Sequence, residues 1–380
     1  MSLTKNFLLI GFTVLVCYLL LVLGDILFGS IIEGSFSNDL QEAKKIESLR
    51  ERKEDSIEIK QARDEGYRQY VYPYLYDSND SLIKISRSLV SSPLANPPYS
   101  YVYYCNEGYG LVTYKSDRFG FRNEDLKWDK KVNIVFIGDS YINGACVKDE
   151  YTISSVFQKI TGLNSLSLGA SGNNPYHYAA YANIFIPRYL PENVVIAFYA
   201  NDNGNFNESL LYDLYVKKNL PFFEKSKENK ISLPKEYKNL FLKENKLKSS
   251  IQEIQKSFPL LKYFSLPTIR FILDFKQNTE NTNFSASEQA LFLAKYLCKT
   301  FKCNLTVLYL PNSLYWRPDA RADKYNDSLK EFCKNNKINF IDASNILDRK
   351  KGSIDYAIKG PHLSPEGYKK VAKYIKKSFE

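Results

Sequence analysis

Histidine is almost absent from this chain, whose 380 residues include only His177 and His362. Neither these histidines nor the six cysteines show the spacing of a zinc site, and no P-loop or RNA-recognition pattern is present. We therefore expect no metal, no organic cofactor and no nucleic-acid partner. The net charge of +10 is attributed mainly to solvated lysine faces.

Charge is missing from residues 6–24, a run of 19 residues between Lys5 and Asp25. That length is sufficient for a helix that crosses a membrane. Lysine and arginine are also missing from residues 25–43, so the positive-inside rule places the N-terminus in the cytoplasm. We expect a single-pass membrane protein, anchored by an uncleaved transmembrane helix at 6–24, with an extracytoplasmic domain. A cleaved signal peptide is the alternative.

Glycine and proline are missing from residues 36–65, where charges of both signs surround a few apolar side chains. This pattern is typical of a solvated helix, and we assign residues 30–98 to a helical stalk and linker. Residues 99–380 form the predicted domain. It begins with a predicted hairpin over Tyr99–Tyr104 and Gly110–Tyr114.

Strands and helices alternate through the rest of the domain. The predicted strands are Val132–Ile137, Ser165–Leu168, Val194–Tyr199, Leu305–Leu310 and Ile338–Ile341. The predicted helices lie near 152–161, 176–187, 286–300, 322–336 and 365–378. The alternation predicts an α/β fold with a parallel sheet and helices on both faces. Residues 204–285 interrupt it after the third strand and are interpreted as an insertion.

The first of these strands ends in Gly138-Asp139-Ser140 and is followed by an amphipathic helix. Glycine allows the backbone to turn sharply, and the serine then lies at the carboxyl edge of the sheet, where parallel sheets bind ligands. A strand–turn–helix of this kind exposes a nucleophilic serine. Gly-Asp-Ser is also common in ordinary turns. It therefore indicates a nucleophile only if other candidate catalytic residues lie at the same edge of the sheet.

Three further segments reach that edge. Gly172 follows the second strand, Asn201 follows the third, and His362 lies just before the last helix. A histidine is the usual general base at neutral pH, and the N–H groups of glycine and asparagine are suitable oxyanion donors. His177 follows Asn174-Pro175 at the start of a predicted helix and is interpreted as a structural or surface residue.

The order Ser, Gly, Asn, His, with the segments GDS at 138–140 and HLSPEGY at 362–368, resembles the SGNH (GDSL-type) hydrolase superfamily over about 130–203 and 290–378. The resemblance implies a flavodoxin-like three-layer sandwich with about five parallel strands. It implies that Ser140 is the nucleophile and His362 the general base. The implied oxyanion donors are Gly172, Asn201 and the Ser140 N–H.

The sequence departs from the family pattern at two positions. Tyr199 stands where the third motif usually has glycine, and Lys359 stands three residues before His362, where the family usually has an aspartate. The carboxylate that orients the histidine is therefore left open. The candidates are Asp355, Asp342 and Asp348, and a Ser–His dyad without a carboxylate is the other option.

The reaction implied by the resemblance is acyl transfer through a serine. We predict a serine esterase that hydrolyses an ester, in particular an O-acyl group, on an envelope carbohydrate or lipid. The basic insertion, with aromatic residues such as Tyr212, Tyr215, Phe222 and Phe223, would suit a sugar chain with anionic groups. The alternatives are an O-acyltransferase that modifies an extracytoplasmic polysaccharide and a non-catalytic glycan-binding relative.

The six cysteines allow disulfides if the domain lies outside the cytoplasm. Cys298 can pair with Cys303, and Cys105 can pair with Cys146. Reduced core cysteines are the alternative.

Overall fold

The computed structural model describes residues 12–24, 27, 42–43, 45–47, 57–73, 94–204, 206–219, 283–319 and 321–379. The chain divides into two compact units, residues 1–42 with 233–281 and residues 43–232 with 282–380. Residues 12–24 of the first unit are helical. Within the described ranges, no helix is both long enough and apolar enough to cross a membrane. Residues 6–11 of the predicted anchor and most of the predicted insertion lie outside these ranges.

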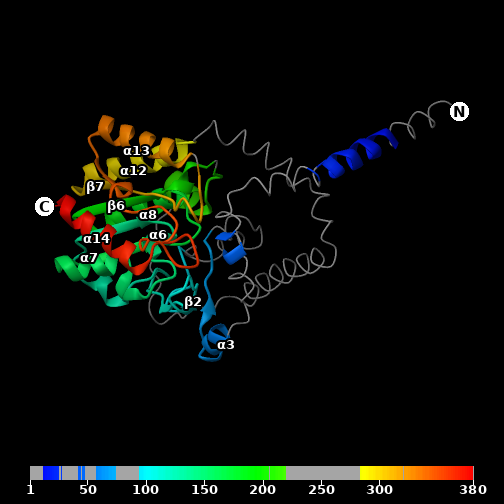
Figure 1. The fold of residues 1–380 in the computed structure, drawn as a ribbon. Helices are drawn as coiled ribbons and strands as arrows, with labels where there is room; N and C mark the ends of the chain where they lie inside the picture. Colours follow the sequence, from blue (N-terminus) through cyan, green and yellow to red (C-terminus); the bar gives the residue numbers. More distant parts are fainter. Residues whose placement is uncertain are drawn as a thin grey trace. The chain divides into compact units, whose positions relative to one another are not determined.

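A parallel sheet forms the centre of the second unit (Figure 1). Its strands are β4 (Ile134–Gly138), β5 (Ser165–Gly169), β6 (Asn193–Tyr199), β7 (Asn304–Leu310) and β8 (Asn339–Asp342). Their order in the sheet is β5-β4-β6-β7-β8, and every neighbouring pair is parallel. This is the flavodoxin-like order, so the predicted α/β architecture with five parallel strands is confirmed within the described residues.

Helices cover both faces of this sheet (Figure 1). Helices α7 (Ile153–Thr161) and α14 (Pro365–Phe379) pack on one face. Helices α8 (Pro175–Tyr189), α12 (Ser285–Phe301) and α13 (Ala322–Asn336) pack on the other. Successive residues of a strand point to opposite faces. In β4, Phe136 accordingly joins the first of these cores and Val135 and Ile137 join the second, which is why the whole strand is apolar.

A small second sheet precedes the central one. The predicted hairpin is formed by β2 (Tyr101–Tyr103) and β3 (Thr113–Lys115), which pair antiparallel. A two-residue strand, β1 (Arg68–Gln69), adds to β2 in parallel and follows helix α3 (Ile57–Asp64). The sequence interpretation placed β1 in the linker, because two residues are too few to show the alternation of a strand.

The beginning of the predicted insertion belongs to the core. Residues Leu210–Tyr212 form helix α9, and a π-helical turn continues it. Tyr212 is buried with its ring 4.9 Å from that of Tyr176, and Tyr215 is buried in the core on the α8 side of the sheet. These two rings are therefore not free to stack on a sugar, contrary to the interpretation from sequence.

Two disulfides are present among the described cysteines, and they are the two pairs suggested by the sequence. Cys105 is bonded to Cys146 and Cys298 to Cys303. Cys17 and Cys333 are free thiols.

Candidate active site

Ser140 lies at the carboxyl edge of the sheet because β4 ends in a turn that only a small residue allows. A Cβ atom on Gly138 would lie 2.5 Å from Cγ1 of Ile142, so the turn requires glycine. Asp139 caps the short helix α6 (Ser140–Asn143) by accepting a hydrogen bond of 2.9 Å from the Tyr141 N–H. Ser140, the first residue of α6, is half-buried.

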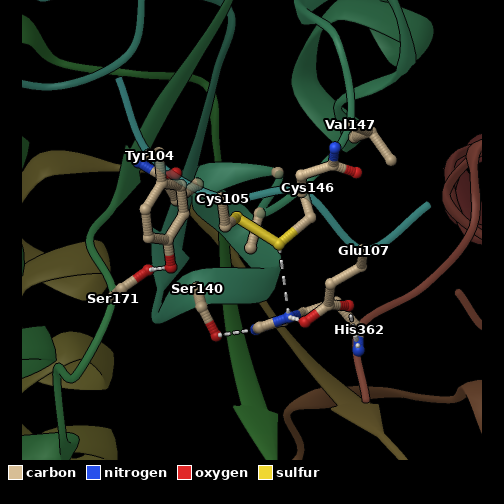
Figure 2. Close-up of a disulfide and its surroundings, with 12 residues drawn as sticks. Tyr104, Cys105, Glu107, Ser140, Cys146, Val147, Ser171 and His362 are labelled. Carbon is tan, nitrogen blue, oxygen red and sulfur yellow. Dashed lines mark hydrogen bonds and ion pairs between the residues drawn. A yellow bond between two sulfur atoms is a disulfide. The ribbon is translucent and has the colours of Figure 1, made fainter. Parts of the chain in front are cut away.

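His362 is held by backbone contacts in the loop before α14. The Ala357 N–H donates to its carbonyl at 2.8 Å, and Leu363 beside it forms a β-bridge with Tyr356. Its Nε2 atom lies 3.0 Å from Oγ of Ser140, although 222 residues separate the two in sequence (Figure 2). The predicted nucleophile and base are thus brought within hydrogen-bond distance.

A third residue completes this arrangement, and sequence reasoning missed it. Oε1 of Glu107 lies 2.8 Å from Nδ1 of His362, and Oε2 accepts the His362 backbone N–H at 3.1 Å (Figure 2). The Glu107 side chain is only 1% exposed. A carboxylate can only accept here, so Nδ1 carries the imidazole proton. Nε2 is then free to accept the proton of Ser140.

Two residues just before His362 in the chain accommodate the Glu107 side chain. The Lys359 side chain is exposed, and its backbone N–H donates to the Glu107 carbonyl at 3.0 Å. Gly360 is buried, and a Cβ atom there would lie 2.0 Å from Cδ of Glu107. The missing side chain at position 360 therefore leaves the space that the Glu107 carboxylate occupies.

The three aspartates that the sequence left open as candidates have other partners. Asp355 forms an ion pair of 2.6 Å with Lys370, and Asp348 accepts the Lys350 N–H. Asp342 caps a 3-10 turn by accepting the N–H of Ser344. A carboxylate does lie on the Nδ1 side of His362, but it is that of Glu107.

The predicted oxyanion residues lie just after the two strands that flank β4. Gly172 follows β5 with a φ of +80°, a left-handed conformation that glycine adopts readily, and Asn201 follows β6. Both residues are exposed at the carboxyl edge of the sheet. Because β5 and β6 lie on either side of β4, these residues flank the Ser140 turn. Their role as donors stays a prediction.

Two buried carboxyl groups lie behind the site. Burial raises the pKa of Asp139 to about 6, an effect reduced by the Tyr141 N–H and by the nearby His362. Burial and then the charge of Asp139 hold the pKa of Asp202 well above its ordinary value. The Tyr178 hydroxyl donates to Asp202 at 3.1 Å, and the Tyr199 N–H donates at 2.9 Å. Asp202 thus accepts hydrogen bonds that hold the turn after β6.

His177 has the structural role expected from sequence. It is fully buried near the start of α8 and takes part in a capping box with Asn174, whose N–H lies 3.3 Å from Nδ1.

One group of possible metal ligands occurs within the described residues: atoms of Glu107, Cys146 and His362 lie within 4.8 Å of one another. The sulfur of Cys146 is bonded to Cys105 and is therefore not a thiolate that could bind a metal.

Comparison with known proteins gives structural matches only. No protein-family model matches the chain, and no curated protein matches it. A GDSL-like lipase from Bacteroides thetaiotaomicron is 16% identical with a TM-score of 0.35, covering 66% of this chain and 88% of its own. A family 3 carbohydrate esterase from Clostridium thermocellum is also 16% identical, with a TM-score of 0.35 and coverages of 65% and 94%. An acetylxylan esterase from Geobacillus stearothermophilus, a catalytic mutant, is 13% identical with a TM-score of 0.36 and coverages of 66% and 96%.

Proposed function

We propose that this chain is a serine esterase in which Ser140, His362 and Glu107 act as nucleophile, base and orienting acid. One observation carries the proposal: hydrogen-bond distances of 3.0 and 2.8 Å join the three side chains in series through the two ring nitrogens of His362. This is the arrangement that turns an unreactive hydroxyl into a nucleophile.

The reaction begins when His362 Nε2 takes the proton of Ser140 as Oγ attacks the carbonyl carbon of an ester. Glu107 stabilises the imidazolium that forms, because its carboxylate lies on the Nδ1 side of the ring. The imidazolium then gives its proton to the leaving alcohol, which departs and leaves an acyl group on Ser140. A water molecule, deprotonated by the same Nε2, releases the acid and restores the serine.

The negative charge of each tetrahedral intermediate needs donors. We assign them to the backbone N–H groups of Ser140 and Gly172 and to the side-chain amide of Asn201, whose positions on either side of the Ser140 turn support this role.

The substrate and location belong to the same proposal. The two disulfides of the second unit suit an oxidising compartment outside the cytoplasm. The uncharged run at residues 6–24 supports attachment to the membrane. A membrane-attached enzyme on that side would meet O-acyl esters of envelope carbohydrates or lipids. A C-terminal reporter fusion that is active only in the cytoplasm would contradict this topology.

A fluorophosphonate probe and p-nitrophenyl acetate test the activity together. Both should react with the wild-type protein, and Ser140→Ala should abolish both reactions. Ser140→Ala and His362→Ala should each remove nearly all turnover, and the double variant should be barely slower than either, since the residues act as a unit.

Accumulation of acylated oligosaccharide in place of free acid would favour the O-acyltransferase. Failure of Ser140 to form any adduct would favour the glycan-binding alternative.

A further inference from the structure

A covalent bond joins the segment that carries the acid to the segment that carries the nucleophile. Cys105 lies two residues before Glu107, and Cys146 lies six residues after Ser140. Their disulfide brings the two Cα atoms to 5.0 Å across a sequence separation of 41 residues. The Cys146 sulfur lies 3.9 Å from Nδ1 of His362, so the bond lies directly beside the triad (Figure 2).

Glu107 needs such a constraint because it lies beyond the end of a strand. Strand β2 ends at Tyr103, and the last hydrogen bonds between the two arms of this hairpin join Val112 to Tyr104 and Cys105. Glu107 follows in the connecting loop, yet its carboxylate is buried. Removing a carboxylate from water is unfavourable unless the chain holds it against a partner. The disulfide supplies that restriction at a point two residues away.

The other end of the bond is also under conformational restraint. Cys146 has a φ of +60°, in the left-handed region that residues with a side chain seldom adopt. It is buried, whereas Cys105 is half-buried. If the bond were broken, the turn at Cys146 would be free to relax to an ordinary conformation and the Glu107 loop would lose its attachment to the α6 segment.

We propose that the Cys105–Cys146 disulfide is a redox switch on the triad: while it is intact it holds Glu107 on His362, and its reduction leaves only the Ser140–His362 dyad. The proposal rests on the esterase function proposed above. It makes the enzyme fully active in an oxidising compartment and weakly active in a reducing one, so the protein would gain its activity with disulfide formation.

The chemical step is thiol–disulfide exchange with a dithiol. A thiolate of the reductant attacks Sγ of Cys105, the S–S bond breaks, and Cys146 leaves as a thiolate that takes up a proton. The second thiol of the reductant, once deprotonated, then displaces Cys105, which is protonated in turn. The products are two cysteine thiols and an oxidised, disulfide-bonded reductant. Attack at Cys105 is favoured because Cys105 is the more accessible of the two residues.

The test measures p-nitrophenyl acetate hydrolysis by the purified full-length protein before and after reduction with dithiothreitol without denaturant, with thiols counted to confirm reduction. We expect kcat to fall about 10- to 100-fold with little change in KM, because the loss is in transition-state stabilisation. The Cys105→Ser, Cys146→Ser double variant should be equally slow and insensitive to dithiothreitol. The matched control, Cys298→Ser with Cys303→Ser, should keep wild-type activity and remain sensitive.

Glu107→Gln distinguishes action through the acid from a general structural effect. If the disulfide acts by placing Glu107, reduction of Glu107→Gln should cause no further loss of kcat. An equal fold-loss in this variant and in the wild type would overturn the proposal, as would full activity in the reduced wild type. These outcomes differ from failure of the esterase itself, in which the oxidised protein would neither hydrolyse the ester nor label at Ser140. If the double serine variant does not fold, the assay on the reduced wild type still tests the proposal.

Discussion

Glu107 Oε1 lies 2.8 Å from Nδ1 of His362, across 255 residues of sequence. The proposed acid therefore comes from the segment before the central sheet, whereas the proposed nucleophile and base lie at the sheet's carboxyl edge. Lys359, three residues before His362, is exposed, whereas the Glu107 carboxylate is buried against the histidine ring.

Glu107→Gln should lower kcat by about 10²–10⁴-fold with a small change in KM. The amide cannot stabilise the imidazolium, and it can donate to Nδ1, which favours the wrong tautomer. Steady-state hydrolysis of p-nitrophenyl acetate measures the effect. Asp348→Asn, in one of the aspartates considered from sequence, is the control and should retain activity. A Glu107→Gln enzyme with wild-type kcat would remove Glu107 from the mechanism.

Gly360→Ala should lower kcat by about tenfold or more while the protein remains folded. The added Cβ would meet Cδ of Glu107 at 2.0 Å, so the carboxylate must move off His362. Kinetics and thermal melting of the same preparation separate the two effects. In the Glu107→Gln background the substitution should cost little further kcat, because the carboxylate that it displaces is already gone. A large additional loss there would show that position 360 acts in another way.

Asn201→Ala should lower kcat by about 100- to 1,000-fold with a smaller change in KM, because an oxyanion donor acts mainly on charge that develops in the transition state. The control is Asn207→Ala, which changes an exposed residue six positions later in the chain and should keep wild-type activity. Both are measured by ester hydrolysis at saturating substrate. An unchanged kcat in Asn201→Ala would exclude it from the oxyanion hole.

Ionisation of the buried Asp117 carboxyl should lower the free energy of unfolding as the pH rises. Burial raises the pKa of the Asp117 carboxyl to about 6 from an ordinary value of 3.8. The hydrogen bonds that it accepts oppose this rise, and their donors are the Asn123 and Trp128 side chains and the backbone N–H groups of Phe119 and Phe121. Since the folded pKa is raised, the carboxyl contributes its full stability below about pH 4 and loses it as the pH rises through 6. A difference of one pKa unit between the folded and unfolded states corresponds to about 1.4 kcal/mol in the free energy of unfolding.

The measurement is the free energy of unfolding in urea at pH 4.5 and pH 7. Asp117→Asn should be less stable than the wild type. Its free energy of unfolding should also fall less between pH 4.5 and pH 7, because the amide does not titrate. Asp129→Asn, whose side chain is 50% exposed in the wild type, should keep the wild-type decrease. Equal pH dependence in wild type and Asp117→Asn would contradict the assignment.

The five parallel strands were predictable because their signals are local. A buried central strand such as Ile134–Gly138 is apolar throughout, and a helix such as Ile153–Thr161 shows its apolar face at helical spacing. The topology then brings the carboxyl ends of these strands to one edge. Ser140 and His362 could therefore be placed together from sequence, since Ser140 follows β4 and His362 lies in the loop before α14.

Sequence alone determined the sheet, its helices and the two residues that meet at its edge, because periodicity and strand ends are properties of neighbouring residues. Only the tertiary structure decided the acid. Glu107 lies in a loop after the three-residue strand β2, in a local pattern that has no feature of a catalytic carboxylate. Its role arises from long-range contacts: the disulfide to Cys146, the space left by Gly360 and the ring of His362. Such contacts join residues far apart in the chain, and although the Cys105–Cys146 pair could be suggested from sequence, no local pattern links it to Glu107.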